Sequence, residues 1–301
     1  MDQKYRRQVS LLLDVLPEVA SEECFALHGG TAINLFVRNM PRLSVDIDLT
    51  YIPIENRQAS LANVRAALLR IKPKLERIVS NVHVTDRADI GKLLVSEQGV
   101  DIKLEVNLVN RGAITPPEPA VLCARAQEEF DAFCEILVVP IGQLYGGKIC
   151  AAVDRQHPRD LFDVKYLLEN EGFSDDVKAG FILALLSSDR PIHELLNPTM
   201  LDQKSVFENH FEGMTLEEFS YDEFEKTREN LVQTIHANLT SKDREFVLGI
   251  IRLTPQWEIY DFEDFPSVKW KLQNIQKLYE NNKSKYAEQL ARLEEVFEKS
   301  I

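Results

Sequence analysis

The stretch that most constrains the fold is S-V-D-I-D-L-T-Y-I at residues 44–52, where apolar and polar side chains alternate. Alternation predicts a strand, because successive side chains of a strand point to opposite faces of a sheet. The apolar residues would face a core, and Asp46 and Asp48 would converge on the other face. Two neighbouring carboxylates repel each other unless a cation lies between them. The pattern indicates a divalent-cation site, although solvated aspartates at a sheet edge would give the same alternation.

The character of the sequence changes near Pro140. Before it, the periodicity predicts strands at 24–28, 44–52, 81–87, 92–98 and 100–109, and helices at 4–20, 31–38 and 57–80, the last interrupted near Pro73. After it, helices are predicted at 141–155, 158–170, 174–188, 215–237, 241–252 and 270–299. We therefore predict an α+β chain with a mixed β-sheet domain over residues 1–140 and a helical domain over residues 141–301.

Charge is distributed unevenly along the chain. The formal net charge is −13, which argues against a simple basic nucleic-acid binder. Residues 1–115 nevertheless carry 15 Lys and Arg against 14 Asp and Glu, whereas the remainder carries 20 against 34. A polyanion would therefore approach the first part of the chain more easily than the second.

The cysteines indicate the cellular compartment, and the hydropathy indicates whether the chain enters a membrane. The four cysteines are widely spaced, without a C-x-x-C pair, and are expected to be small core residues in a reducing cytoplasm. The first 20 residues do not resemble a signal peptide, and no apolar run reaches the length of a membrane helix. The prediction is a cytoplasmic protein that does not associate with membranes.

A glycine pair lies upstream of the aspartates. The apolar strand at 24–28 leads into Gly29 and Gly30, and a helix is expected to open with Thr31. Backbone N–H groups at the start of a helix favour a phosphate, and the threonine hydroxyl can add a donor. A tight turn followed by a helix cap is the alternative explanation.

A third carboxylate is predicted on the strand at 100–109. In V-D-I-K-L-E-V-N-L, Asp101, Lys103 and Glu105 share one face. If this strand lies beside residues 45–52, Asp101 or Glu105 joins the aspartate pair. Such a carboxylate would complete metal coordination or accept a proton from an attacking hydroxyl. An amphipathic strand with one solvated face remains the alternative.

A second cluster of charged residues lies in G-G-K-I-C-A-A-V-D-R-Q-H-P-R-D-L-F-D-V at 146–164. Lys148 and Arg155 are seven residues apart and share a helix face. Asp160 and Asp163 follow early in the next helix, where carboxylates are favoured. Arg159 is expected to pair with carboxylates. Helix capping and salt bridges would account for part of this pattern.

Taken together, the glycine pair, the D-x-D strand and the later strand carboxylate resemble the DNA polymerase beta-type nucleotidyltransferase superfamily. Four separated motifs narrow the resemblance to the AbiEii/MenT group of nucleotidyltransferase toxins. They are G-G-T-A-x-x-L, R-x-S-x-D-I-D-L, K-x-x-A-x-x-D-R-x-x-P-R-D-x-x-D and the late V-K-W-K-L-Q-N-I-Q-K-L. Asp163–Val164 is a minor departure from the family pattern. The resemblance implies a nucleotidyltransferase-type sheet domain, with the helical domain contributing Lys148 and Asp160 to the active site.

The resemblance implies that Asp46 and Asp48 hold Mg²⁺, or Mn²⁺, carrying an NTP. The expected catalytic residues are Asp46, Asp48, Glu105, Lys148 and Asp160. The expected nucleotide-binding residues are Gly29, Gly30, Thr31, Arg42, Ser44, Lys148 and Arg155. Lys148 would hold the triphosphate, and Asp160 would orient Lys148 or the acceptor hydroxyl. Arg42 would reach phosphate or form a loop salt bridge, and the Ser44 hydroxyl would point into the site or bond to a neighbour.

The function implied is transfer of NMP from an NTP to an RNA acceptor, with tRNA expected, by the toxin of a bacterial toxin–antitoxin or phage-defence pair. A winged-helix antitoxin would be its partner. One alternative is a nucleotidyltransferase that modifies a small molecule, because the acidic helical domain suits a cationic aminoglycoside. Another is a catalytically inactive domain that binds a partner, which the intact carboxylate pair and Lys148 disfavour.

Surface charge would discriminate between an RNA and a drug acceptor. A basic track running from the aspartates across Arg38, Arg42, Arg65, Arg70 and Lys72 would favour RNA. An acidic pocket would favour a cationic drug.

Overall fold

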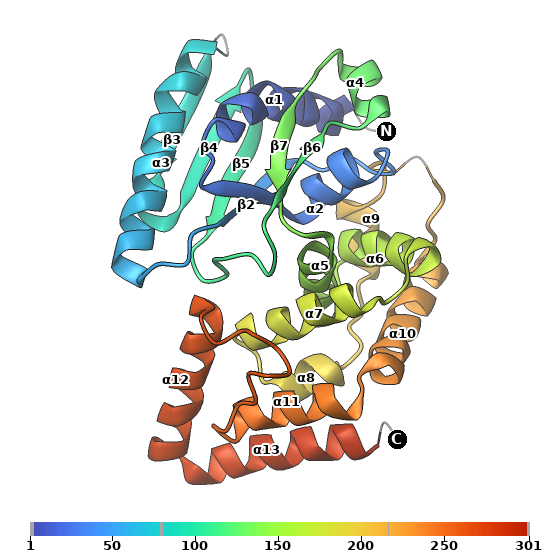
Figure 1. Cartoon of the computed structure of the whole chain (residues 1–301). Coiled ribbons are helices and arrows are strands. Elements are labelled where there is room, and N and C mark those ends of the chain that lie inside the picture. Colours follow the sequence, from blue (N-terminus) through green and yellow to red (C-terminus); the bar gives the residue numbers. More distant parts are fainter. Residues whose placement is uncertain (1–2, 79–80, 216, 300–301) are drawn as a thin grey trace. The chain divides into compact units, whose positions relative to one another are not determined.

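The computed structural model describes residues 3–78, 81–215 and 217–299, and it contains two compact units (Figure 1). The first unit comprises the chain up to Pro140 together with His210–Glu218, and the second comprises Ile141–Asn209 and the chain from Phe219 onward. The return of His210–Glu218 to the first unit was not predicted. Within it, Arg42 forms a β-bridge with Thr215, and the Leu43 N–H donates to the Met214 carbonyl at 2.9 Å.

The first unit is built around one mixed sheet. Its strands are β1 (Phe25–His28), β2 (Asp46–Tyr51), β3 (Val82–Arg87), β4 (Lys92–Glu97), β5 (Val100–Asn107), β6 (Glu118–Val121) and β7 (Glu135–Val138). In the described residues these seven strands follow the order β3-β4-β5-β2-β1-β7-β6. Neighbouring strands are antiparallel except for β2–β5 and β1–β7, which are parallel. With the helical second unit, this confirms the α+β prediction.

Helices and short helical turns complete the first unit. They are α1 (Gln3–Ala20), α2 (Gly29–Thr31), the π-helix η1 (Ala32–Val37), α3 (Arg57–Ile78), the 3₁₀ turn η2 (Ala88–Ile90) and α4 (Ala124–Phe130). The apolar sides of α1 and α3 build the core with alternate, fully buried residues of the strands, such as Ile47 and Leu104. Burying one face of the sheet leaves the polar face of β2 and β5 for chemistry.

The predicted interruption of the third helix is wrong. Helix α3 runs through Pro73 from Arg57 to Ile78. Its buried residues Leu68, Ile71 and Leu75 continue on one face across the proline. Tertiary packing of that face therefore outweighs the hydrogen bond that the proline removes.

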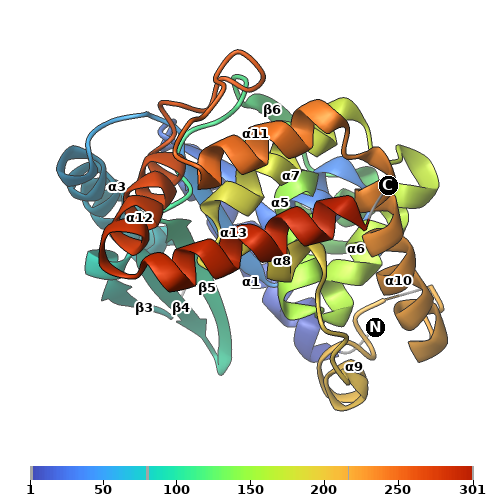
Figure 2. The same ribbon diagram turned by 90° about the horizontal axis from the view of Figure 1, so that it is seen from below.

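The second unit is helical. It contains α5 (Ile141–Arg155), α6 (Pro158–Asn170), α7 (Asp175–Ser187), α8 (Ile192–Leu196), α9 (Lys204–His210), α10 (Tyr221–Asn238), α11 (Ser241–Ile251), α12 (Pro266–Asn281) and α13 (Lys283–Glu298). Helix α13 runs beside α11 and α8 (Figure 2). The single helix predicted over 270–299 is two helices that meet at Asn282, whose extended backbone (φ −150°, ψ 75°) ends one and whose side chain caps the next.

Helices α5 and α7 are in very close contact because glycines line their crossing. A Cβ on Gly146 would lie 2.1 Å from the Gly180 backbone, and one on Gly180 would lie 2.1 Å from the Gly142 carbonyl oxygen. The backbones can approach this closely only without side chains there. This contact fixes α5, the helix that carries Lys148.

Candidate active site

Four charged side chains form a compact group on the polar face of the sheet. Parallel pairing places Asp46 opposite Lys103 and Asp48 opposite Glu105. All four are half-buried, and their neighbours along each strand point to the core. We call Asp46, Asp48, Lys103 and Glu105 the sheet quartet. Its register brings together the two aspartates and one carboxylate of the next strand, as the polar alternation of the sequence suggested.

The register also distinguishes the two candidates for the third carboxylate. Glu105 lies directly beside Asp48, whereas Asp101 lies beyond the part of β5 that pairs with β2 and is exposed. Asp101 is instead opposite Ser96 on β4. Of the two, only Glu105 belongs to the quartet.

Two lysines neutralise Glu105. Its Oε2 lies 2.7 Å from Lys103 Nζ, and its Oε1 lies 2.9 Å from Lys92 Nζ, which reaches across from β4. Burial would raise the pKa of Glu105, but the hydrogen bonds and charges of the two lysines outweigh it and lower the pKa. Glu105 is therefore a paired carboxylate, not an isolated one.

The glycine pair lies against the aspartates and the loop before them. Gly29 has φ +74°, and a Cβ there would lie 2.6 Å from Asp48 Oδ2. A Cβ on Gly30 would lie 2.7 Å from Arg42 Nη2 and 2.9 Å from Ser44 Oγ. At Gly29 the backbone and the close approach of Asp48 both favour glycine, and a larger residue at Gly30 would displace Arg42 or Ser44.

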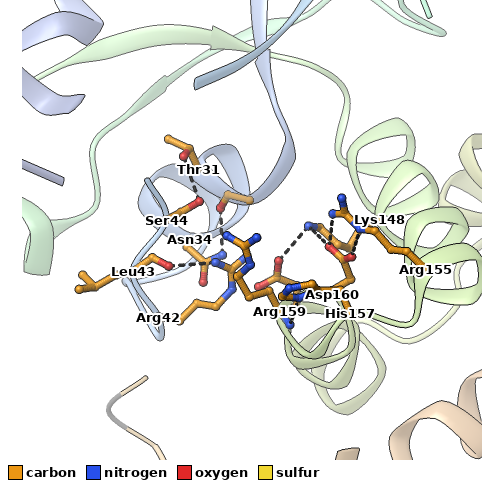
Figure 3. A network of polar contacts seen from close by, with 12 residues as sticks. Thr31, Asn34, Arg42, Leu43, Ser44, Lys148, Arg155, His157, Arg159 and Asp160 are labelled. Carbon is orange, nitrogen blue, oxygen red and sulfur yellow. Dashed lines mark hydrogen bonds and ion pairs between the residues drawn. The ribbon is translucent and has the colours of Figure 1, made fainter. Parts of the chain in front are cut away.

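Thr31 connects this turn to β2. Its Oγ1 lies 2.5 Å from the Asp46 carbonyl oxygen. The same atom lies 3.1 Å from Ser44 Oγ (Figure 3). Ser44 is buried and precedes β2, so its hydroxyl faces Thr31 and Gly30. Arg42 is also buried, and its Nη1 donates to the Leu43 carbonyl at 2.9 Å. These contacts fix the start of the strand that carries both aspartates.

The charged cluster predicted in the second unit forms a network within that unit. Lys148 Nζ lies 2.9 Å from Asp160 Oδ1 and 3.1 Å from Asp163 Oδ2. Arg155 Nε lies 2.5 Å from Asp160 Oδ2 (Figure 3). The two aspartates are 1% exposed and Lys148 is 7% exposed, whereas the Arg155 side chain is exposed; the four charges together sum to zero.

Local sequence signals place these groups. Pro158 begins α6, and His157 Nδ1 accepts the Arg159 N–H at 3.1 Å. Asp160 then falls in the first turn of α6. Burial would raise its pKa, but Lys148 and Arg155 outweigh that effect and hold the pKa well below its usual range.

Sequence reasoning assigned no role to Lys92 or Lys103. The signal for Lys103 was its place between Asp101 and Glu105 on the polar face of β5. No comparable signal existed for Lys92, because its contact with Glu105 depends on the antiparallel pairing of β4 with β5.

The expected basic track is interrupted. Arg42 is buried, Arg70 pairs with Glu22 at 2.6 Å, and Lys72 Nζ lies 3.9 Å from Glu76. These three cations are therefore buried or paired. Arg65 and Arg70 are nevertheless exposed, so the basic track stays a prediction.

The carboxylates of Asp46 and Asp48 suit a hard divalent cation that would arrive with a nucleotide. Within the described part of the chain, no group of three or more His, Cys, Asp or Glu side chains is arranged to hold a metal. Asp46 and Asp48 supply two carboxylates on one face, and Mg²⁺ commonly takes one or two protein carboxylates together with substrate phosphates. The pair fits that ion, with phosphate oxygens and water completing its shell.

No helix in the described residues combines the length and apolar character that crossing a membrane would need.

Comparison with known proteins supports the reading of the motifs. A search of curated proteins found no match. Among solved structures, the fold is similar to MenT4, a nucleotidyltransferase toxin from Mycobacterium tuberculosis H37Rv, with a TM-score of 0.61 and 12% identity over 90% of this chain and 93% of that chain. At this identity the similarity shows the fold alone.

The family model described as "Nucleotidyl transferase AbiEii toxin, Type IV TA system" matches residues 10–274. The match includes the glycine pair, the sheet quartet and the Lys148 network. The chain therefore belongs to the AbiEii family of nucleotidyltransferase toxins of type IV toxin–antitoxin systems.

Proposed function

We propose that this protein transfers NMP from an NTP to a hydroxyl group of an RNA, with tRNA as the expected acceptor, in a reaction that depends on Mg²⁺ and is also supported by Mn²⁺. The observation that carries the proposal is the sheet quartet beside Gly29 and Gly30. Two adjacent carboxylates with a close-packed glycine turn suit a metal-bound triphosphate and have no evident purpose in a binding module.

The residues of the sheet have distinct tasks in this scheme. Asp46 and Asp48 bind the metal ion, which when present neutralises charge developing on the α-phosphate. Gly29 and Gly30 let backbone and phosphate approach closely, and Thr31 holds the start of β2 in place. The acceptor hydroxyl attacks the α-phosphorus, the bond to the β-phosphate oxygen breaks, and pyrophosphate leaves.

We propose from the family motif that Lys148 binds the triphosphate and that Asp160 positions it. The Lys148 ammonium donates a hydrogen bond to Asp160 Oδ1 at 2.9 Å and forms an ion pair with Asp163 Oδ2 at 3.1 Å. Arg155, which is 61% exposed at its side chain, shares Asp160 and keeps that carboxylate ionised.

The biological setting follows from the family. A toxin of this class acts opposite an antitoxin, and we propose a winged-helix antitoxin as the cognate partner, a role in phage defence and a cytoplasmic site of action. To test the activity, the protein is incubated with each α-labelled NTP, Mg²⁺ and total RNA. Labelled tRNA is expected with at least one NTP.

A parallel reaction replaces RNA by an aminoglycoside. Label in the drug and none in RNA would replace the RNA proposal with the small-molecule alternative. Absence of label in both, in protein whose fold is verified by circular dichroism, would contradict the proposed activity.

A further inference from the structure

The third carboxylate of the sheet quartet, Glu105, is paired with two lysines. Both oxygens of Glu105 are ion-paired, to Lys92 Nζ at 2.9 Å and to Lys103 Nζ at 2.7 Å. Where nucleotidyl transfer uses two divalent cations, the second cation lies near the attacking oxygen and needs ligands of its own. Glu105 is the carboxylate best placed to be such a ligand, but two ammonium groups already bind it.

Lys103 occupies a particular place in the quartet. It is directly opposite Asp46 across the β2–β5 pairing and two residues before Glu105 on β5. All these side chains are on one face, so the ammonium group is among three carboxylates. A divalent cation bound beside Glu105 would face this positive charge at short range in a half-buried setting, where repulsion is poorly screened.

We propose that Lys103 takes the place of a second divalent cation, so that this site binds one divalent ion per nucleotide. Glu105 then positions Lys103 and is not a metal ligand. This inference rests on the proposed function, because it concerns the cations that accompany the NTP. Lys103 supplies fixed positive charge beside the reacting phosphate, where a two-metal site would use a second ion.

The electrostatic setting agrees with a permanently charged lysine. Burial lowers the pKa of Lys103, but its hydrogen bond to Glu105 and the charges of Asp46, Glu105 and Asp48 outweigh burial and raise the pKa.

Metal stoichiometry provides the test. The full-length chain is dialysed against Mn²⁺ and an α,β-methylene analogue of the NTP selected in the transfer assay, and retained metal and nucleotide are both counted per chain. The variants are Lys103→Met, Lys103→Gln and, as matched control, Lys92→Met, which removes the other lysine of Glu105 but lies one strand further from Asp46.

We expect one Mn²⁺ per bound nucleotide in the wild-type protein and in Lys92→Met, and two in Lys103→Met and Lys103→Gln. Two Mn²⁺ per nucleotide in the wild-type protein would overturn the role of Lys103 and leave the proposed function intact. A ratio of one in both Lys103 variants would also overturn it. If no NTP supported transfer in the labelling assay, so that no analogue could be selected, that result would instead contradict the proposed function itself.

Discussion

Asp48 occupies the space in which any residue other than glycine at position 29 would place its Cβ. The virtual Cβ of Gly29 is 2.6 Å from Asp48 Oδ2, and the backbone at Gly29 is left-handed with φ +74°. Glycine therefore serves two purposes here, one conformational and one steric. The two can be separated, because Gly99 has nearly the same backbone (φ +78°) with nothing within 4 Å of its virtual Cβ.

Substitution of Gly29 by alanine is expected to abolish nucleotide transfer, because Asp48 must move. The left-handed backbone should also cost about 1–2 kcal/mol in the free energy of unfolding. Gly99→Ala should lose a similar amount of stability and keep its activity. Urea unfolding and transfer of α-label measure the two effects. A fully active Gly29→Ala enzyme would show that the position of Asp48 does not matter for the reaction.

Removal of Lys148 is expected to destabilise the protein as well as inactivate it. Lys148→Met leaves Asp160 and Asp163 buried without their shared cation, which should cost about 3–5 kcal/mol. Asp160 keeps its ion pair with Arg155, so adding Asp163→Asn, which removes the other carboxylate charge, should restore part of the stability but none of the activity. Urea midpoints and labelled transfer are measured for the single and double variants. Recovery of activity in the double variant would assign Lys148 a purely structural role.

The Lys148 network also predicts a dependence of stability on pH. Lys148 and Arg155 hold the folded pKa of Asp160 well below its usual range. The resulting stabilisation is complete above the unfolded pKa of about 4, declines below it and is lost as the pH falls through the folded pKa. The difference in unfolding free energy between the wild-type protein and Asp160→Asn should therefore be larger at pH 7 than at pH 3. If this difference in unfolding free energy were the same at pH 7 and at pH 3, ionised Asp160 would not be the stabilising group.

Ser44 is expected to tolerate loss of its hydroxyl but not added charge. Ser44→Ala removes one contact with Thr31 and should cost about 1 kcal/mol with activity retained. Ser44→Glu places a carboxylate beside Gly30 and the start of β2, and should abolish transfer. Ser44→Gln separates charge from size, since it adds the same bulk without charge. A transfer assay that finds Ser44→Glu active would place the hydroxyl away from the bound phosphates.

The alternating strands were the part of the fold most readable from sequence. In β2 and β5, the charged residues are flanked by buried apolar residues, so the faces followed from periodicity alone. The short strands β6 and β7 were missed, because four residues carry too little periodicity and β6 contains Pro119. The π-helix after Thr31 was predicted only as a helix, since its wider hydrogen bonding leaves no simple sequence pattern.

At the candidate site, the sequence could not predict how strands that are distant along the chain pair with each other. The sequence placed Asp101 and Glu105 on one face but could not select between them, since that choice depends on the β2–β5 register. The lysine partners of Glu105 depend on the same register and on β4. The burial of Arg42 likewise depends on a bridge to Thr215, which is far away along the chain.

The most direct test of the central claim compares label at the α and γ positions of the same NTP. Matched reactions with Mg²⁺ and tRNA use the wild-type protein, Asp46→Asn and Asp48→Asn, which keep side-chain shape and remove one metal ligand each. We predict that α-label enters tRNA with one pyrophosphate released per NMP transferred, and that γ-label never enters tRNA. Each variant should remain folded and should lose at least about 100-fold in transfer rate. Label from the γ position in tRNA, or full activity in either variant, would contradict NMP transfer at the Asp46–Asp48 pair.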